Sequence, residues 1–228
     1  MTAIAIRQRQ PRPEHWWQGR PSRLVRDVLQ RAGLFPVLRV LCRRFRVEGV
    51  EHVEGLRGPA IFVANHSSHF DTCLVVKALP VETRRRLTVA AAADYFYRSK
   101  AKASFVSLLL NTFPFDRERG EESLALCERS LRDGWSVLIF PEGTRSMTGE
   151  VGRFKRGVGL LAARTGAPVV PLHIEGASEL MPKGQSIPRR ADVMVRIGAP
   201  LAFGRDADAV EVANVLRGRV IALASVEG

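Results

Sequence analysis

Cysteine is scarce in this chain of 228 residues. Its three cysteines, Cys42, Cys73 and Cys127, are widely spaced, and no C-x-x-C motif occurs. A set of this kind supports neither a disulfide framework nor a thiolate metal site. We therefore interpret all three as ordinary buried or half-buried side chains, which suits a reducing compartment.

Long hydrophobic runs are absent from residues 1–50. The longest stretch there without a charge, AGLFPVL at 32–38, is far shorter than the ~20 apolar residues that span a bilayer. No secretory hydrophobic region with a cleavage site is present either. The pattern predicts a chain that lies on a membrane and does not cross one.

Acidic residues are few relative to basic ones. Asp and Glu number 23 against 35 Lys and Arg, which gives a formal net charge of +12. A surplus of this size predicts a polyanionic partner, which is nucleic acid, an anionic membrane surface or a phosphorylated substrate. Aromatic residues make up only 7%, and no helix-turn-helix, zinc-finger or RNA-recognition signature is present. A nucleic-acid-binding protein is therefore the weaker alternative, and we expect no nucleic-acid partner.

Residues 1–45 are expected to form a basic amphipathic helical segment. Eleven arginines face only three acidic residues within 1–50. Apolar residues recur there every three to four positions, as in an amphipathic helix, and Pro36 should kink or split that helix. Trp16 and Trp17 lie beside arginines, a composition that suits a helix at an anionic membrane surface. The alternative is a helix that packs on its own domain and leaves a solvated basic face.

The rest of the chain, residues 46–228, alternates strands and helices. This alternation predicts one α/β domain with a mostly parallel central sheet and helices on both faces. Pro171 should place its strand at an edge, at a bulge or near a strand end. Strands are predicted at 59–64, 87–93, 112–116, 136–140, 167–174 and 192–198, and helices at 70–79, 97–110, 120–133, 157–166 and 207–224.

Polar clusters follow three of these strands. They are NHSSHFD at 65–71, FDR at 115–117 and PEGTR at 141–145. In sheets of this kind, binding and catalytic residues usually lie at the carboxyl ends of the strands, in the loops that lead to the following helices. The three clusters are therefore predicted to form one site.

In the first cluster, four residues separate His66 from Asp71. If a helix begins between them, the carboxylate accepts a hydrogen bond from the imidazole, which fixes the tautomer and makes the other ring nitrogen more basic. Such a histidine can remove a proton from a hydroxyl group. Two other hypotheses stay open from these residues alone: Asn65 or Ser67 caps the helix, or His66 and His69 bind a metal with Asp71. The metal hypothesis is the weaker one, because cysteine ligands, an H-E-x-x-H motif and an evident fourth ligand are all missing.

The other two clusters each place an arginine, Arg117 or Arg145, just past a strand. A guanidinium there can hold a phosphate through two parallel hydrogen bonds. Gly143 permits close backbone approach, and neighbouring N–H groups could serve an oxyanion or a phosphate. The alternatives are a surface pair of Asp116 with Arg117 and a plain turn at 142–144. Neither a phosphate-loop signature nor a G-x-S-x-G nucleophile elbow is present, which argues against a P-loop nucleotide enzyme or a serine hydrolase.

Together, NHSSHFD, FPFDR and FPEGTRS, followed by FKRGVGLLAARTGAPVVPLHI, resemble the glycerolipid acyltransferases over about residues 45–200. Within that superfamily the pattern looks most like the 1-acylglycerol-3-phosphate acyltransferases. The resemblance implies that residues 46–228 are an acyltransferase domain, and residues 1–45 are the segment whose composition predicts membrane association. It also implies that His66 and Asp71 form the catalytic pair, with Asn65 and Ser68 in support. Arg117 and Arg145 are implied to bind the acceptor phosphate, in a pocket shaped by Glu142, Gly143 and Thr144. Phe115 and Lys155 are implied as further supporting residues, and Pro171 is implied to lie beside the acyl chain.

The sequence departs from this pattern at one point. Many members of the family carry a lysine just after the third strand, where this chain reads AAAADYF at 90–96. That lysine is thought to help hold the acceptor phosphate, so Lys100, Lys102 or Lys155 would have to act in its place.

The resemblance implies an O-acyltransferase that moves a fatty acyl group from acyl-CoA or acyl carrier protein to the free hydroxyl of 1-acylglycerol-3-phosphate. It implies no metal and no organic cofactor, and a location at the cytoplasmic face of the cell membrane. Other acceptors stay open, namely glycerol-3-phosphate, a lyso-ornithine lipid and a phosphatidylinositol mannoside. A lipid-binding protein without catalysis is a further alternative.

Overall fold

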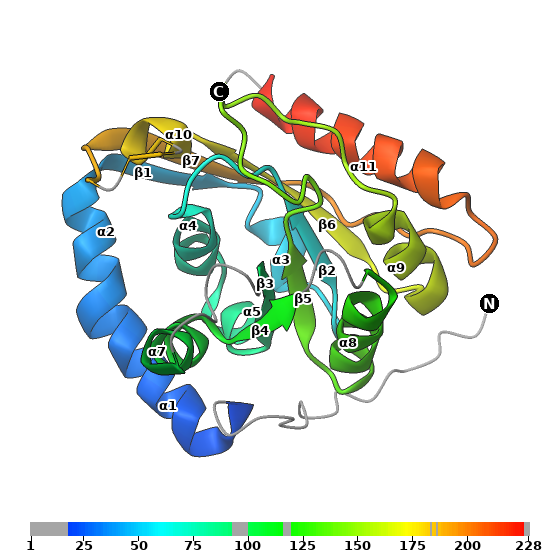
Figure 1. The fold of residues 1–228 in the computed structure, drawn as a ribbon, viewed down its shortest axis with the longest axis horizontal. Coiled ribbons are helices and arrows are strands. Elements are labelled where there is room, and N and C mark those ends of the chain that lie inside the picture. Colours follow the sequence, from blue (N-terminus) through cyan, green and yellow to red (C-terminus); the bar gives the residue numbers. More distant parts are fainter. Residues whose placement is uncertain (1–17, 93–99, 116–119, 183, 186, 226–228) are drawn as a thin grey trace.

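A seven-stranded sheet forms the centre of the structure, a computed structural model that describes residues 18–92, 100–115, 120–182, 184–185 and 187–225 (Figure 1). The strands lie in the order β1-β7-β6-β2-β5-β3-β4, and every neighbouring pair is parallel except β6 with β7. The predicted α/β class with a mostly parallel sheet is confirmed. In chain order the elements are α1 (Arg20–Leu29), the π-helical segment η2 (Gln30–Leu34), α2 (Phe35–Leu41), β1 (Cys42–Glu48), α3 (Glu51–Glu54), β2 (Ile61–Ala64), α4 (Asp71–Ala78), α5 (Val81–Arg85), β3 (Leu87–Ala92), α7 (Lys100–Leu110), β4 (Thr112–Phe115), α8 (Gly120–Arg132), β5 (Ser136–Ile139), α9 (Gly157–Thr165), β6 (Val169–Glu175), α10 (Ala177–Leu180), β7 (Ala191–Ile197) and α11 (Ala209–Ala224).

The sheet separates two hydrophobic cores. Successive side chains of a strand point to opposite faces, so Phe62 and Ala64 of β2 enter one core while Ile61 and Val63 enter the other. The first core lies beneath α2, α4 and α10, and the second beneath α8, α9 and α11. All four residues of β2 are buried, as expected for a parallel strand that is covered on both faces. The end of β2 is therefore a rigid base for the residues that follow it.

The amino-terminal helix is shorter than predicted. Pro36 lies in the first turn of α2, directly after the π-helical segment, so the predicted interruption of the helix is confirmed. The prediction of helix as far as Phe45 is wrong, because Cys42–Glu48 forms β1 and Phe45 pairs with Val193 of β7. Arginine and apolar residues alternate in this stretch, which is the period of a strand at a sheet edge.

α1 is fixed to the carboxyl end of α7. Buried Arg26 donates from Nε to the carbonyl of Leu108 (2.7 Å), and buried Gln30 donates from Nε2 to the carbonyl of Leu109 (2.7 Å). The last carbonyls of a helix have no partner within it, so these two side chains satisfy groups that would otherwise be buried unpaired. Burial lowers the pKa of Arg26 to about 10, yet the guanidinium stays charged at neutral pH. The inner face of α1 is thus part of the domain, while Leu24 and Val28 on its outer face are exposed among the described residues.

Pro171 does not lie in an edge strand. β6 is an interior strand between β7 and β2, so the edge alternative is wrong. The antiparallel ladder with β7 ends at the pair Leu172–Ile197, and the Pro171 carbonyl accepts a hydrogen bond from the N–H of Gly198 (2.8 Å) just beyond it. Pro171 lies inside β6 and pairs with Val63 of β2, so the strand-end alternative is also wrong; proline, which has no N–H, lies where the ladder with β7 stops.

Candidate active site

A cavity of about 980 Å³ opens beside the carboxyl ends of the central strands. One part of its wall is polar and cationic, with His66, Thr144, Arg145, Lys155 and Arg156. A larger part is apolar and comes from several elements. A cavity with one charged part and one apolar part suits an amphiphile that carries an anionic group. The apolar wall includes Val89, Ala90, Val106, Leu109, Leu110, Phe115, Leu124, Ile139, Val158 and Leu160.

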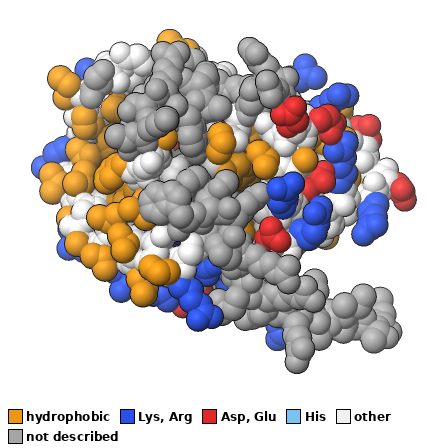
Figure 2. Space-filling model, turned by 60° about the horizontal axis from the view of Figure 1, so that its bottom comes forward, with side chains coloured by type: hydrophobic (Ala, Val, Ile, Leu, Met, Phe, Trp, Pro, Cys, Tyr) orange, Lys and Arg blue, Asp and Glu red, His pale blue; other side chains and the backbone are white. Residues whose placement is uncertain are grey.

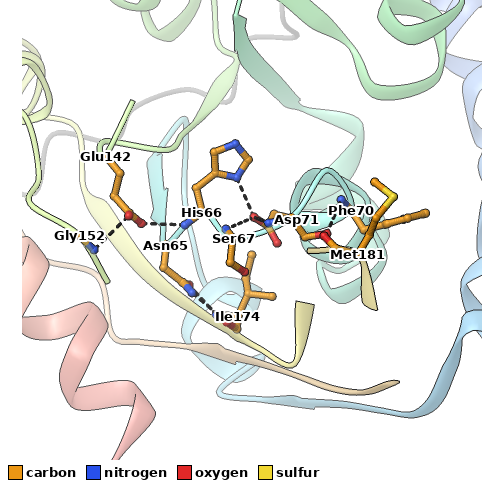
Figure 3. Close-up of polar contacts among 10 residues, drawn as sticks. Asn65, His66, Ser67, Phe70, Asp71, Glu142, Gly152, Ile174 and Met181 are labelled. Atoms are coloured by element: carbon orange, nitrogen blue, oxygen red, sulfur yellow. Dashed lines mark hydrogen bonds and ion pairs between the residues drawn. The ribbon is translucent and has the colours of Figure 1, made fainter. Parts of the chain in front are cut away.

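The loop between β2 and α4 is wound around the carboxylate of Asp71. Asp71 is fully buried, and its Oδ2 accepts hydrogen bonds from Nδ1 of His66 (2.7 Å), from the N–H of Ser67 (2.7 Å) and from the N–H of Ser68 (2.8 Å) (Figure 3). In the neutral imidazole, Nδ1 therefore carries the proton and Nε2 is the free base. The pairing of His66 with Asp71 that the spacing predicts is present in the structure.

The imidazole of His66 faces the cavity. Its side chain is 21% exposed, whereas that of Asp71 is 0% exposed, and His66 is one of the residues that line the cavity. The ring also stacks on Phe140, with centroids 4.3 Å apart and an interplanar angle of 24°. Figure 3 shows the second ring nitrogen on the side away from Asp71. A ring held by a carboxylate and an aromatic face is oriented for proton transfer at Nε2.

The helix-capping hypothesis is wrong for Asn65 and Ser67, because α4 has no side-chain cap. Asn65 instead pairs with the backbone of Ile174 in β6, donating to its carbonyl (2.9 Å) and accepting from its N–H (2.7 Å). Ser68 donates from Oγ to the carbonyl of Met181 (3.1 Å). Asn65 thus fixes the loop to β6, and Ser68 fixes it to the residue that follows α10.

The metal hypothesis required three converging ligands. His66 and His69 both lie in the loop before α4, so they do not share a helical face. Across the described residues, no group of three or more His, Cys, Asp or Glu side chains is placed to hold a metal ion.

Glu142 has a different place from the pocket-shaping one that the resemblance implied. Its carboxylate is buried, accepts from the N–H of His66 on Oε1 (2.8 Å) and from the N–H of Gly152 on Oε2 (3.0 Å), and is not part of the cavity wall. Burial raises the pKa of Glu142, while the two backbone hydrogen bonds and the nearby His66 oppose that rise. The carboxylate of Glu142 therefore joins the loop between β2 and α4 to the loop at 151–156. A Cβ at residue 152 would lie 2.7 Å from Oε2, so Gly152 is needed beside this carboxylate, a requirement that sequence reasoning missed.

Gly143 makes room for the head of Lys155. Its φ is +71°, and a Cβ there would lie 2.8 Å from both Cε and Nζ of Lys155. The N–H of Ser146 bonds to the carbonyl of His66 (2.7 Å), which connects the loop that carries Arg145 to the loop between β2 and α4. His66, Arg145 and Lys155 consequently share one cavity. The predicted convergence of the first and third polar clusters is confirmed.

The second cluster is described only in part. Phe115, the last residue of β4, lines the cavity, whereas Asp116 and Arg117 lie outside the described residues. The same is true of Trp16 and Trp17, and of the side chains of residues 100–102. Pro171 is not among the residues of the cavity wall, so the described structure does not place it beside the acyl chain as the resemblance implied.

Cys73 lies in the wall of the same cavity as His66. Burial, together with the negative charge of Asp71, raises the pKa of the Cys73 thiol to about 12. The group stays a neutral thiol at physiological pH, and a thiol is a poor nucleophile compared with a thiolate. Cys73 is thus an apolar wall residue, in agreement with its interpretation from sequence.

Comparison with known proteins agrees with this geometry. The family model described as Acyltransferase matches residues 44–175, which is more than half of the chain. The chain therefore belongs to the acyltransferase family.

Within that family, the chain is similar to enzymes named 1-acyl-sn-glycerol-3-phosphate acyltransferase. It is 30% identical over 172 residues to the chloroplastic BAT2 enzyme of Brassica napus, which covers 71% of this chain and 46% of the relative. It is 30% identical over 175 residues to the chloroplastic LPAT1 enzyme of Arabidopsis thaliana, which covers 72% of this chain and 45% of the relative. The chain thus spans about half the length of the curated relatives it matches.

The fold has a counterpart among solved structures. The crystal structure of the 1-acyl-sn-glycerophosphate (LPA) acyltransferase, PlsC, from Thermotoga maritima superimposes with a TM-score of 0.68 and 24% sequence identity. The match covers 90% of this chain and 81% of that chain. At this identity the likeness establishes a shared fold.

Proposed function

We propose that this protein is an O-acyltransferase that moves a fatty acyl group from a thioester to the free hydroxyl of 1-acylglycerol-3-phosphate and forms phosphatidate. The observation that carries the proposal is the His66–Asp71 pair, set at the cationic part of a cavity whose remaining wall is apolar. The names of the similar proteins support this choice of acceptor.

The geometry supports general-base catalysis. Nε2 of His66 takes the proton of the acceptor hydroxyl while the hydroxyl oxygen attacks the thioester carbonyl carbon. The new C–O bond forms, the C–S bond breaks, and the imidazolium returns the proton to the departing thiolate. Asp71, hydrogen-bonded to Nδ1, stabilises the imidazolium that forms in between. The thioester is already activated, so the reaction needs no covalent acyl-enzyme and no metal.

The transition-state oxyanion requires a backbone donor near Gly143. The N–H of Gly143 itself is bonded to the carbonyl of Phe140 (3.0 Å). The donor in this proposal is therefore a neighbouring N–H of the same turn, which would stabilise the negative charge that develops on the carbonyl oxygen.

Each part of the acceptor and donor has a matching part of the cavity. Arg145 and Lys155 supply positive charge for the acceptor phosphate, and Lys155 takes the place of the lysine that is missing after the third strand. The apolar wall built by α7, β3 and α9 would receive a fatty acyl tail. Arg117, if it follows the family pattern, adds a second guanidinium to the phosphate site.

We also propose that the outer face of α1 and α2 docks the protein on an anionic membrane. Leu24, Val28 and Val40 are 65%, 63% and 65% exposed. Figure 2 shows hydrophobic side chains gathered on the side where α1 and α2 lie, with basic side chains at the edge of the group. Exposed apolar residues beside arginines such as Arg31 and Arg39 fit an interfacial helix. In the part of the chain that the structure describes, none of the helices has the length and apolar character needed to cross a membrane.

The decisive experiment combines purified protein, labelled acyl-CoA or acyl carrier protein, and a panel of lyso-acceptors, with thin-layer chromatography of the products. We expect labelled phosphatidate from 1-acylglycerol-3-phosphate and none from the His66→Ala variant, with folding and liposome binding intact. If the only product came from glycerol-3-phosphate, a lyso-ornithine lipid or a phosphatidylinositol mannoside, the proposed acceptor would be wrong and that compound would replace it. Liposome binding without any turnover would leave a lipid-binding protein and end the enzymatic proposal.

A further inference from the structure

Arg217 on α11 is hydrogen-bonded to the loop at 151–156. Its Nε donates to the carbonyl of Gly152 (2.8 Å), and its Nη2 donates to the carbonyl of Val151 (2.9 Å). The donors of one planar guanidinium thus hold two successive carbonyl groups. Two hydrogen bonds from a rigid group fix the orientation of the backbone more closely than one bond does. In the described structure, Arg217 is not part of the cavity wall, so its effect on the site has to pass through this loop.

The peptide group between Val151 and Gly152 lies between a cation and a carboxylate. Its carbonyl accepts from Nη2 of Arg217, and its N–H donates to Oε2 of Glu142 (3.0 Å). A peptide group whose carbonyl is bonded to a cation becomes a stronger donor at its N–H, because hydrogen bonds in a chain polarise one another. Arg217 therefore both orients and strengthens the N–H that holds Glu142.

Glu142 carries this connection to His66. Its other oxygen, Oε1, accepts from the N–H of His66 (2.8 Å). Figure 3 shows the carboxylate between the N–H groups of Gly152 and His66. The carboxylate is buried, so a backbone donor that is lost there is costly to replace. The backbone of His66 is thus connected to α11 through one carboxylate and one peptide group.

α11 is a firm support for the guanidinium. Its residues Val212, Leu216 and Val220 are buried in the core that lies beneath α8, α9 and α11. Asp208 caps the helix by accepting from two backbone N–H groups on Oδ1 (2.9 and 2.8 Å). A side chain on a packed and capped helix starts from a fixed point, so the hydrogen bonds that begin there are held in one arrangement.

The cationic end of the same loop has attachments of its own. The N–H of Lys155 bonds to the carbonyl of Pro141 (2.9 Å), and Phe154 is 3% exposed and packs in the same core. Loss of the Arg217 hydrogen bonds should therefore release residues 151–152 and leave Lys155 in the cavity wall. An effect on the base can thus be measured apart from an effect on the cations of the cavity.

We propose that Arg217 is a positioning residue for His66, acting through the 151–152 peptide group and Glu142. The inference rests on the proposed function and extends it to a side chain outside the cavity wall. Asp71 orients the imidazole ring, whereas this connection fixes the backbone from which the ring extends. Without Arg217 the peptide group can rotate, its bond to the carboxylate weakens, and Nε2 leaves the position in which it meets the acceptor hydroxyl. A displaced base slows proton transfer and leaves substrate binding unchanged.

The first test is two-substrate kinetics of the Arg217→Met variant, which keeps an unbranched side chain and loses every donor. We expect kcat to fall about tenfold to a hundredfold, as for a misplaced catalytic group, with both KM values within about twofold of wild type. Arg217→Lys keeps one charged donor and should recover part of the lost rate. The matched control is Arg219→Met, at an exposed position on the same helix, which should leave kcat unchanged.

NMR of the protein without substrates separates this inference from the proposed function. An amide proton moves upfield when its hydrogen bond weakens, and this shift needs no turnover. In Arg217→Met we expect upfield shifts of the amide protons of both Gly152 and His66, and neither shift in Arg219→Met. The decisive signal is that of His66, because Gly152 belongs to the peptide group that Arg217 itself binds. A shifted His66 signal in a protein without acyl-transfer activity would refute the proposed function and leave the connection standing.

Three results would overturn the inference. A His66 amide signal at its wild-type position would confine the effect of Arg217 to the loop. A rise in the acceptor KM with unchanged kcat would assign Arg217 to the placement of Lys155. A lower free energy of unfolding with unchanged kcat would leave Arg217 as a support of the fold alone.

A double variant tests whether Arg217 and Glu142 act on one connection. Glu142→Gln/Arg217→Met should be no slower than the slower of the two single variants, because the second change removes a contact that the first has already disabled. Losses that multiply would show two independent effects and refute the connection. If Arg217→Met does not fold, Arg217→Lys takes its place in every measurement, with smaller changes in the same directions.

Discussion

Replacing Asp71 by asparagine separates the charge of the His66–Asp71 pair from its shape. Oδ2 of Asp71 accepts three hydrogen bonds, and all three partners, Nδ1 of His66 and the N–H groups of Ser67 and Ser68, are donors. An asparagine side chain would therefore place its oxygen at the Oδ2 position. Its amide nitrogen would then occupy the position of Oδ1, which has no hydrogen-bond partner among the described residues. The loop keeps its form, the negative charge is lost, and one buried amide is left unpaired.

The magnitude follows from the charge on the imidazole during the reaction. Two unit charges centred about 4 Å apart attract by about 4 kcal/mol at an effective dielectric constant near 20. That energy corresponds to a factor of about 10³ in rate. We expect kcat to fall about 10³-fold for Asp71→Asn, with little change in either KM, because the carboxylate acts on the transition state and not on substrate binding. The unpaired buried amide should lower the free energy of unfolding by about 1–3 kcal/mol.

The assay measures labelled phosphatidate at saturating donor and acceptor, and urea unfolding measures stability in parallel. Ser68→Ala is the control, because it removes a hydrogen bond of the same loop and keeps the carboxylate; its kcat should stay within about tenfold of wild type. His66→Ala/Asp71→Asn should be no slower than His66→Ala alone, since the two residues act as a unit. Retention of more than a tenth of wild-type kcat by a folded Asp71→Asn variant would refute the reasoning.

Arg145→Gln should raise the acceptor KM about tenfold and the thioester KM much less, as measured by two-substrate kinetics; equal rises would remove Arg145 from the acceptor phosphate. Glu142→Gln should destabilise the fold by about 1–3 kcal/mol, since an amide nitrogen cannot accept from a backbone N–H. Burial raises the pKa of Glu142 above 4.5. The difference in free energy of unfolding between wild type and this variant should therefore be greatest below that pH and decrease as the pH rises through the raised pKa. Urea unfolding from acid to neutral pH measures the sign of this change. Leu24→Glu/Val28→Glu should release the protein from anionic liposomes in co-sedimentation, whereas Val215→Glu on α11 should not; unchanged binding of the double variant would place the membrane contact elsewhere.

Much of the fold could be predicted because its central strands are short, mostly apolar runs. β2, β5 and β6 are covered on both faces, so their sequences are mostly apolar, with Ser136, His173 and Glu175 as the polar members. The helices α3, α5 and α10 were not predicted, since helices of four or five residues are too short to show a period. The antiparallel direction of β7 relative to β6 was not predictable either, because the direction of a strand depends on how it pairs with its neighbours and not on its own sequence.

The candidate site was predicted in its chemistry better than in its geometry. The spacing of His66 and Asp71 indicated a hydrogen bond, and the strand ends indicated a common location. The sequence around Glu142 does not show on which side of its loop the carboxylate lies, and only the fold directs it toward the N–H groups of His66 and Gly152. Arg26 was one of eleven arginines in a basic segment, and nothing in its neighbouring sequence distinguishes it from exposed arginines such as Arg31 and Arg39.

The attachment of α1 to α7 has a practical consequence for deletion experiments. Leu109 and Leu110 form part of the wall that would enclose the fatty tail, and the end of their helix is held by Arg26 and Gln30. Deleting α1 would remove the side chains that donate hydrogen bonds to the carbonyls of Leu108 and Leu109. It would thereby also destabilise the part of the cavity wall that would enclose the fatty tail. Inactivity of such a truncated protein could therefore result from lost membrane binding, from a distorted acyl-tail cavity, or from both. Point changes on the outward side of the helix keep the two effects apart.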